Sequence, residues 1–230
     1  MSRPEPIKNQ VDGILADIFS ADQAYALLRE IGQHAERINQ KHFGPFFAPV
    51  QDRLRKDCLL SIAKLYDQPH RRYSTRSIRA LVDAVKASAD NLNITKSPAL
   101  LNRFVWAGIN SDDFYDVADS AITERLVQWC QSRLAGRNTL ASANIWRASE
   151  ALKFRRDKVI THNELVSSDA APDLTWDRVN SLLELAKTIV DLVSSGYLNY
   201  FLTADDGSFL LARDVEQSTV CLRRLLQSLN

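Results

Sequence analysis

The sequence predicts a single all-α domain, a helical bundle with additional helices and no β-sheet. Only seven glycines and seven prolines occur among 230 residues, whereas the helix formers Ala, Leu, Arg, Glu and Lys are frequent. Apolar residues recur at intervals of three and four along most of the chain, the period of a helix with one buried face. No segment alternates convincingly with the period of two that marks a strand, and no repeat or low-complexity linker divides the chain. We therefore expect seven to nine helices in one domain, residues 1–230.

The N-terminal third should contain two long helices. The polar, proline-marked stretch 1–9 is expected to be flexible. Apolar residues at helical spacing then continue to about residue 41, either as one bent helix or as two helices with Ser20 as the N-cap of the second. The letters FGPFF interrupt this pattern, and a second amphipathic helix should run from Val50 to about Asp67.

A basic connector, HRRYSTRSIRA at 70–80, follows the second helix. It holds four arginines and one histidine without an acidic residue, and Ser74 or Thr75 is placed to cap the next helix. A basic loop that leads into a helix N-terminus can bind phosphate, because backbone N–H groups and the helix dipole favour an anion there. It can equally be a solvated connector. The candidate phosphate-binding residues of the connector are Arg71, Arg72, Arg76 and Arg79.

The rest of the chain carries further helices with recognisable ends. Ser97 and Pro98 form an N-cap and a first helical position, and Thr175 within PDLTW should cap a later helix with a wide apolar face. The letters ADDGS mark a turn before the last helix. These helices are expected at residues 98–106, 112–134, 140–162, 176–193 and 215–226.

Charge and cysteine content limit the classes of partner and site. The net charge is +1, so any contact with nucleic acid would depend on a local basic patch. Cys58, Cys130 and Cys221 form no CxxC pair, which argues against a zinc site or a disulfide framework and favours buried thiols in a reducing cytoplasm. No apolar run approaches the ~20 residues that span a bilayer, and the N-terminus lacks the apolar stretch of a secretory signal. We therefore expect a soluble, cytoplasmic protein with no membrane partner.

Most motifs that announce a known chemistry are missing from the sequence. It contains no GxGxxG, GxxxxGK[ST], HExxH or GxSxG, so dinucleotide binding, P-loop hydrolysis, zinc proteolysis and α/β-hydrolase chemistry have no support. The paired ExxH motifs of a di-iron bundle are also missing. These absences favour a metal-free or non-enzymatic function.

The segment RRDKVITHNE gathers charged groups near the end of a predicted helix. On a regular helix, at ~100° per residue, Arg155 and His162 lie within about 20° of each other, whereas Arg156 lies about 120° from His162 across an apolar stripe. The segment can be a charged helix end, because basic side chains favour the negative end of the helix dipole. It can also be catalytic, because histidine exchanges protons near neutral pH and the donor fork of arginine holds a phosphate. These two groups suffice, without metal or cofactor, to activate the 2′-hydroxyl of RNA against its adjacent phosphate.

The letters RDKVITH, an arginine followed by a polar residue and then a histidine, resemble the signature of the HEPN superfamily (higher eukaryote and prokaryote nucleotide-binding). The letters LRKDCLLSIAKLYD before the connector and DLTWDRVNSLLELAKTIVDLV after the motif further resemble the branch related to U-type abortive-infection proteins of bacteria. This resemblance implies a helical bundle that forms a homodimer in which the two motifs face a shared cleft. For many members it also implies a metal-independent endoribonuclease of a toxin–antitoxin or phage-defence system, with RNA as substrate and a cognate antitoxin as partner.

The resemblance assigns roles to residues by their position in the motif. Arg156 corresponds to the family arginine, Asp157 to the supporting polar residue and His162 to the family histidine. Arg155 is the alternative arginine, because six residues separate it from the histidine and five separate Arg156 from it, both within the family range. Lys158 is a further candidate for binding RNA phosphate.

Three functions remain open from the sequence. The protein is an endoribonuclease that uses the Arg-x5-His motif, a non-catalytic HEPN-like module that binds RNA, a nucleotide or a protein, or a structural helical protein with a charged helix end. Cleavage of RNA in EDTA separates the first from the other two. Salt-dependent binding without cleavage identifies the second.

Overall fold

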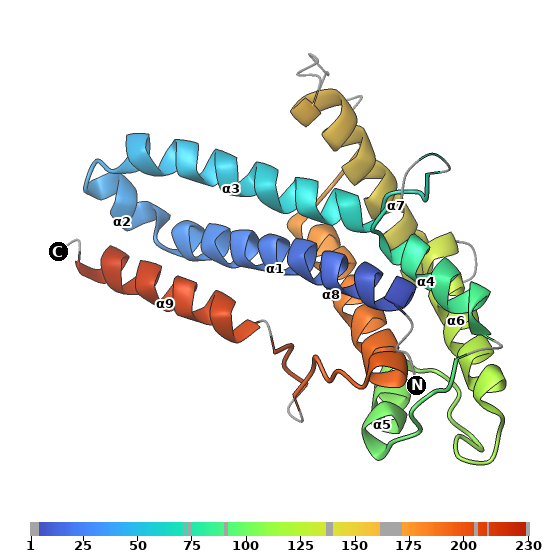
Figure 1. Cartoon of the computed structure of the whole chain (residues 1–230). Coiled ribbons are helices and arrows are strands. Elements are labelled where there is room, and N and C mark those ends of the chain that lie inside the picture. The colour runs from blue at the N-terminus through green and yellow to red at the C-terminus, as the bar shows by residue number, and fades with distance from the viewer. Residues whose placement is uncertain are drawn as a thin grey trace.

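Helices account for nearly all of the regular structure of the chain (Figure 1). The computed structural model describes residues 5–70, 72, 75–89, 92–136, 140–161, 172–204, 207–210 and 212–228. Over these residues there are nine α-helices and no β-sheet, which confirms the predicted fold class. The α-helices are α1 (Glu5–Gln33), α2 (Ala35–Gln40), α3 (Gly44–Leu65), α4 (Ile78–Ala87), α5 (Pro98–Ala107), α6 (Asp119–Ala135), α7 (Leu140–Phe154), α8 (Trp176–Val193) and α9 (Ala212–Ser228). Two π-helical segments continue α7 and α8, namely η2 (Arg155–Thr161) and η3 (Ser194–Leu198).

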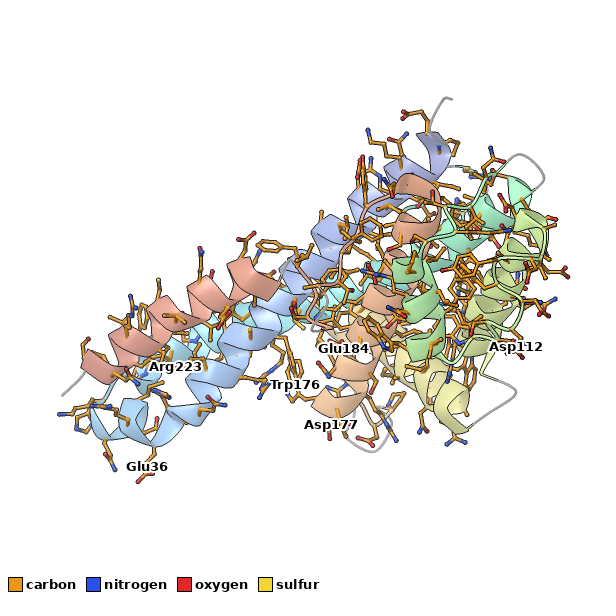
Figure 2. The ribbon with its side chains drawn as sticks, turned by 90° about the horizontal axis from the view of Figure 1, so that it is seen from below. Glu36, Asp112, Trp176, Asp177, Glu184 and Arg223 are labelled. Carbon is orange, nitrogen blue, oxygen red and sulfur yellow. The ribbon has the colours of Figure 1, made fainter. Side chains whose placement is uncertain are left out.

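Three helices form an arm on one side of the molecule (Figure 1 and Figure 2). α1 packs along α3, α9 packs along α1, and the short α2 joins α1 to α3 at the outer end. Arg223 of α9 donates from Nε and Nη2 to the buried carboxylate of Glu30 in α1, at 2.9 and 2.8 Å. A small apolar cluster lies beside this pair and consists of Ile31, Ile38, Phe47 and Leu226. Apolar contacts and a charged pair therefore both fix the C-terminal helix to the arm.

The helices α4 to α8 pack together at the other end of α1 and α3 (Figure 1). α8 lies at the centre of this part and contacts α1, α3 and α7. Nζ of Lys187 in α8 lies 2.9 Å from Oδ1 of Asp22 in α1. The buried hydroxyl of Tyr66 donates to the carbonyl oxygen of Leu182 at 2.6 Å, and burial raises its pKa, so the proton stays on the oxygen. The end of α3 is thereby fastened to α8.

Side-chain caps define where several helices begin. The hydroxyls of Ser97 and Thr175 accept the backbone N–H groups of Leu100 and Arg178, which confirms both predicted caps. The cap predicted at Ser74 or Thr75 is wrong, since Ser77 accepts the N–H of Ala80 at the start of α4. The N-cap considered at Ser20 is also wrong. Ser20 lies inside the continuous helix α1 and accepts a hydrogen bond from Ser61 of α3 at 3.2 Å.

Three helix boundaries differ from those expected. Residues 5–9, expected to be flexible, belong to α1. The letters FGPFF do follow a break in the helical pattern, but the second helix, expected from Val50, already begins within them at Gly44, because a proline is tolerated in the first turn, where its missing N–H has no partner to lose. The helix predicted at 112–134 begins only at Asp119, since residues 112–116 form turns in which Asp113 has a φ of 57°.

The three cysteines differ in their burial. Cys58 and Cys130 are buried, and burial raises the pKa of each thiol to about 12, whereas Cys221 is exposed on α9 and corrects the expectation of three buried thiols. Among the described residues, none of the helices combines the length and apolar character needed to cross a bilayer.

Candidate functional site

The segment that carries the predicted motif leaves α-helical geometry. α7 ends at Phe154, and η2 continues it with hydrogen bonds between residues five apart. Such a helix holds more than 3.6 residues per turn, so each residue turns the chain by less than 100°. The turn of 100° per residue on which the expected separations rest therefore does not apply over Arg155–Thr161, and His162 itself lies outside the described residues. π-helical turns are rare in proteins and frequently occur at functional sites.

Two carboxylates hold the side chain of Arg156. Its Nε donates to Oδ1 of Asp157 at 2.7 Å, and its Nη1 donates to Oδ1 of Asp67, just beyond the end of α3. Burial alone would lower the pKa of Arg156, but the hydrogen bonds to Asp157 and Asp67 outweigh it and raise the pKa. The guanidinium is therefore always charged, and its direction is set by α3 as well as by its own helix.

A cavity of about 270 Å³ lies beside Arg156, and we call it the Arg156 cavity. Its walls come from the end of α3, the connector, α4 and α7. Three cationic side chains and two carboxylates line it, which gives a formal charge of +1 with histidine neutral. The lining residues are Ala63, Tyr66, Asp67, Gln68, His70, Thr75, Arg79, Ser149, Glu150, Lys153 and Arg156. Two segments that the sequence presents separately, the connector and the RRDKVITHNE segment, therefore meet at one hollow.

Arg79 is the connector arginine that reaches this cavity. Its Nη2 donates to the carbonyl oxygen of Leu134 in α6 at 3.1 Å, which fixes the guanidinium between α4 and α6. Its Nε is buried and has no acceptor among the described residues. A buried donor without a partner is costly, so this nitrogen is an unsatisfied group in the wall of the cavity.

The other connector arginines lie elsewhere. Arg76 packs on α1, where an ideal Cβ placed on Gly13 would lie 2.2 Å from Cδ of Arg76, so the glycine makes room for that side chain. Arg72 is exposed, and its backbone N–H donates to Nδ1 of His70 at 3.2 Å. Arg71 lies outside the described residues.

The remaining motif residues differ in their surroundings. His162 lies outside the described residues. Arg155 lines neither of the two hollows beside α7, and its Nε is buried without an acceptor in the described part of the chain. Lys158 is exposed and lines a second hollow beside α7, which we call the Trp146 groove. Of the two candidate arginines, Arg156 is thus the one that faces a cavity.

Three charged residues at the Arg156 cavity have no role in the sequence-based interpretation. Glu150 and Lys153 precede Arg156 at steps of three along α7, and that spacing could have indicated that neighbouring residues share one side of the helix. Asp67 precedes Arg156 by 89 positions, so no local pattern connects the two. The contact depends on how α3 packs against α7.

The described residues contain no group of three or more His, Cys, Asp or Glu side chains that could hold a metal ion. The guanidinium groups of Arg79 and Arg156 and the ammonium group of Lys153 are of the kind that can bind an anion, and they line the Arg156 cavity together with two carboxylates.

Comparison with known families identifies the family to which the chain belongs. The model of the family HEPN_AbiU2, described as AbiU2, matches residues 4–217. The chain belongs to the HEPN AbiU2 family. The match confirms the resemblance to the abortive-infection branch of the HEPN superfamily, and it spans this AbiU2 protein from α1 into α9, so that it includes η2 and the Arg156 cavity. No curated protein and no solved structure matches the sequence.

Proposed function

We propose that this AbiU2 protein is a metal-independent endoribonuclease of the bacterial abortive-infection type, with Arg156 and His162 as its catalytic residues. The observation that supports this most directly is the place of Arg156 at a cavity that two further cations line. An arginine so placed can bind a phosphate of RNA with its donor fork, and Arg79 and Lys153 add positive charge beside it.

The proposed reaction is transfer of a phosphoryl group within the RNA chain. His162 removes the proton from a 2′-hydroxyl, and the resulting oxygen attacks the adjacent phosphorus. The bond to the 5′-oxygen breaks, and that oxygen leaves with a proton supplied by a histidine or by water. Arg156 holds the non-bridging oxygens as negative charge grows on them. The products are a 2′,3′-cyclic phosphate and a 5′-hydroxyl end.

A homodimer forms part of this proposal. In a symmetric pair, Arg156 of one protomer can act together with the histidine motif of its partner, so a single chain need not bring both groups together. Native mass spectrometry and sedimentation measure the dimer independently of activity.

The test is cleavage of RNA by purified protein in EDTA. Wild type should cleave, and Arg156→Ala and His162→Ala should each reduce the rate by at least about a hundredfold. Arg53→Ala is the matched control, because Arg53 is an arginine on α3 that is 78% exposed and forms only a surface pair with Asp57. Its rate should equal that of wild type. Equal cleavage by all four proteins would overturn the proposal.

One observation favours a second candidate function, a binding module without catalysis. Asp67 and Asp157 already occupy donors of Arg156, so the arginine can be engaged as a structural contact. Binding of RNA that weakens steeply with salt, with no cleavage over hours, would support this alternative.

A further inference from the structure

The Trp146 groove is the larger of the two hollows beside α7. Its volume is about 580 Å³, against about 270 Å³ for the Arg156 cavity. Trp146 lies on its wall with 46% of its surface exposed, and the partly buried Phe154 lies further along the same helix. An indole of this exposure leaves an aromatic surface open to a planar ligand.

Cationic side chains surround this aromatic surface. Four of them line the groove together with three carboxylates, which again gives a formal charge of +1. Two of the carboxylates, Asp157 and Asp173, are already paired, with Arg156 at 2.7 Å and with Arg178 at 2.9 Å. Arg147 and Lys153 form no ion pair within the part of the chain that is described, so they can meet a phosphate.

The groove and the Arg156 cavity share part of their lining. Glu150 and Lys153 belong to both, so the two hollows adjoin each other along α7. Trp146 and Arg156 are ten residues apart, which corresponds to about 15 Å along a helix that rises 1.5 Å per residue. A strand with one phosphate at Arg156 can therefore pass Lys153 and bring a nucleotide further along the strand to Trp146.

We propose that the Trp146 groove binds an unpaired base of RNA on the same strand as the phosphate held at Arg156. An aromatic side chain among cations is the usual means of binding single-stranded nucleic acid, because every base has a face that can stack. Bases inside a duplex are already stacked and cannot reach the indole. This inference rests on the proposed function and adds its substrate class, single-stranded RNA, and a residue that selects it.

The test measures binding in the His162→Ala background, so that the RNA stays intact. A fluorescently labelled single-stranded RNA and a duplex of the same sequence are titrated with protein in EDTA and followed by anisotropy. Trp146→Ala should weaken single-strand binding about tenfold and leave the weaker duplex binding unchanged, whereas Trp146→Phe should retain most of the affinity. Trp106→Ala is the matched control, because Trp106 is 58% exposed on α5 and lines neither of these hollows.

The exposed residue Arg147 supplies a second, independent variant. Arg147→Ala should weaken binding and reduce its dependence on salt concentration, as expected when one phosphate contact is lost. Equal single-strand affinities for the Trp146→Ala and Trp106→Ala proteins would overturn the inference. So would a change of mass in solution on Trp146→Ala with RNA affinity unchanged, since the groove would then bind protein. If wild type fails to cleave RNA but Trp146 still determines single-strand binding, the ribonuclease proposal is wrong, whereas the inference that the Trp146 groove binds single-stranded RNA stands.

Discussion

Nη1 of Arg156 donates a hydrogen bond to Oδ1 of Asp67, which stands 89 positions earlier in the chain, just beyond the end of α3. Nε of the same guanidinium donates to Asp157. The guanidinium of Arg156 is thus in contact with two carboxylates. A phosphate that binds in the Arg156 cavity has to share the guanidinium with them. Asp67 therefore both orients the arginine and opposes the incoming anion.

Replacing Asp67 by Asn should tighten RNA binding. The amide keeps an acceptor oxygen for Arg156, but it removes one negative charge and raises the formal charge of the cavity from +1 to +2. We expect the Kd for single-stranded RNA, measured in the His162→Ala background at low salt, to fall several-fold. Asp52→Asn is the control, because Asp52 forms an exposed surface pair with Lys56. Unchanged or weaker binding by Asp67→Asn would show that orientation of the arginine outweighs repulsion.

Substitution by lysine should separate the two candidate arginines. Lysine keeps the charge but loses the planar fork that binds a phosphate through two donors. Arg156→Lys should lower kcat for RNA cleavage by about a hundredfold, whereas Arg155→Lys should change it by less than about threefold, since Arg155 faces neither hollow. Rates at saturating RNA measure both effects, with circular dichroism as the check of folding. A larger loss of kcat for Arg155→Lys than for Arg156→Lys would assign the catalytic role to Arg155.

The buried pair of Arg103 and Asp191 should carry much of the stability of the segment after α8. Their side chains are 8% and 7% exposed and meet at 2.7 Å, while Asp191 also accepts the N–H of Leu202. Arg103→Ala leaves a buried carboxylate unpaired, so the free energy of unfolding in urea should fall by about 3–5 kcal/mol. Arg53→Ala, at an exposed pair, should change it by less than about 1 kcal/mol. Similar values for both variants would contradict this account.

The docking of α9 should weaken in acid. The hydrogen bonds from Arg223, more than the opposing effect of burial, lower the pKa of Glu30 below its ordinary value of 4.5. Because the pKa of Glu30 is lower in the folded state, its pair with Arg223 stabilises the fold at pH values above the unfolded-state pKa. This contribution is lost as the pH falls through the folded-state pKa.

The difference in unfolding free energy between wild type and Arg223→Gln should therefore be largest near neutral pH and shrink at lower pH. Urea unfolding followed by circular dichroism at several pH values measures it. Arg224→Gln, at the adjacent exposed position, is the matched control and should show no such trend. A difference that is independent of pH would rule out the ionised pair as its source.

The sequence was sufficient for the fold class and for elements with local signals. Ser97 and Thr175 were predictable caps, because the cap residue and the N–H that it binds lie three positions apart. The N-cap prediction at Ser20 was wrong because a polar residue within a helix can instead form a hydrogen bond with a neighbouring helix, here with Ser61. A cap sequence alone does not distinguish these two uses.

The candidate site was only partly predictable for a related reason. The resemblance of the motif to the HEPN signature could be recognised because its residues are close together in the sequence, and the family match confirms the family. The contact of Asp67 with Arg156 depends on the packing of α3, α4 and α7, and so does the position of Arg79, alone of the connector arginines that the structure describes, at the Arg156 cavity. No local pattern encodes this packing. The π-helix at Arg155–Thr161 was not expected either, because its residues fit an ordinary α-helix equally well.

The most direct test of the central claim uses one RNA oligonucleotide in two forms, the second with a single 2′-deoxy nucleotide at the cleaved position. We predict that wild type, in EDTA, cleaves the first form to a 2′,3′-cyclic phosphate and binds the second with similar affinity without cleaving it. Cleavage of the 2′-deoxy form at the same bond, or products that end in a 3′-hydroxyl, would contradict the mechanism.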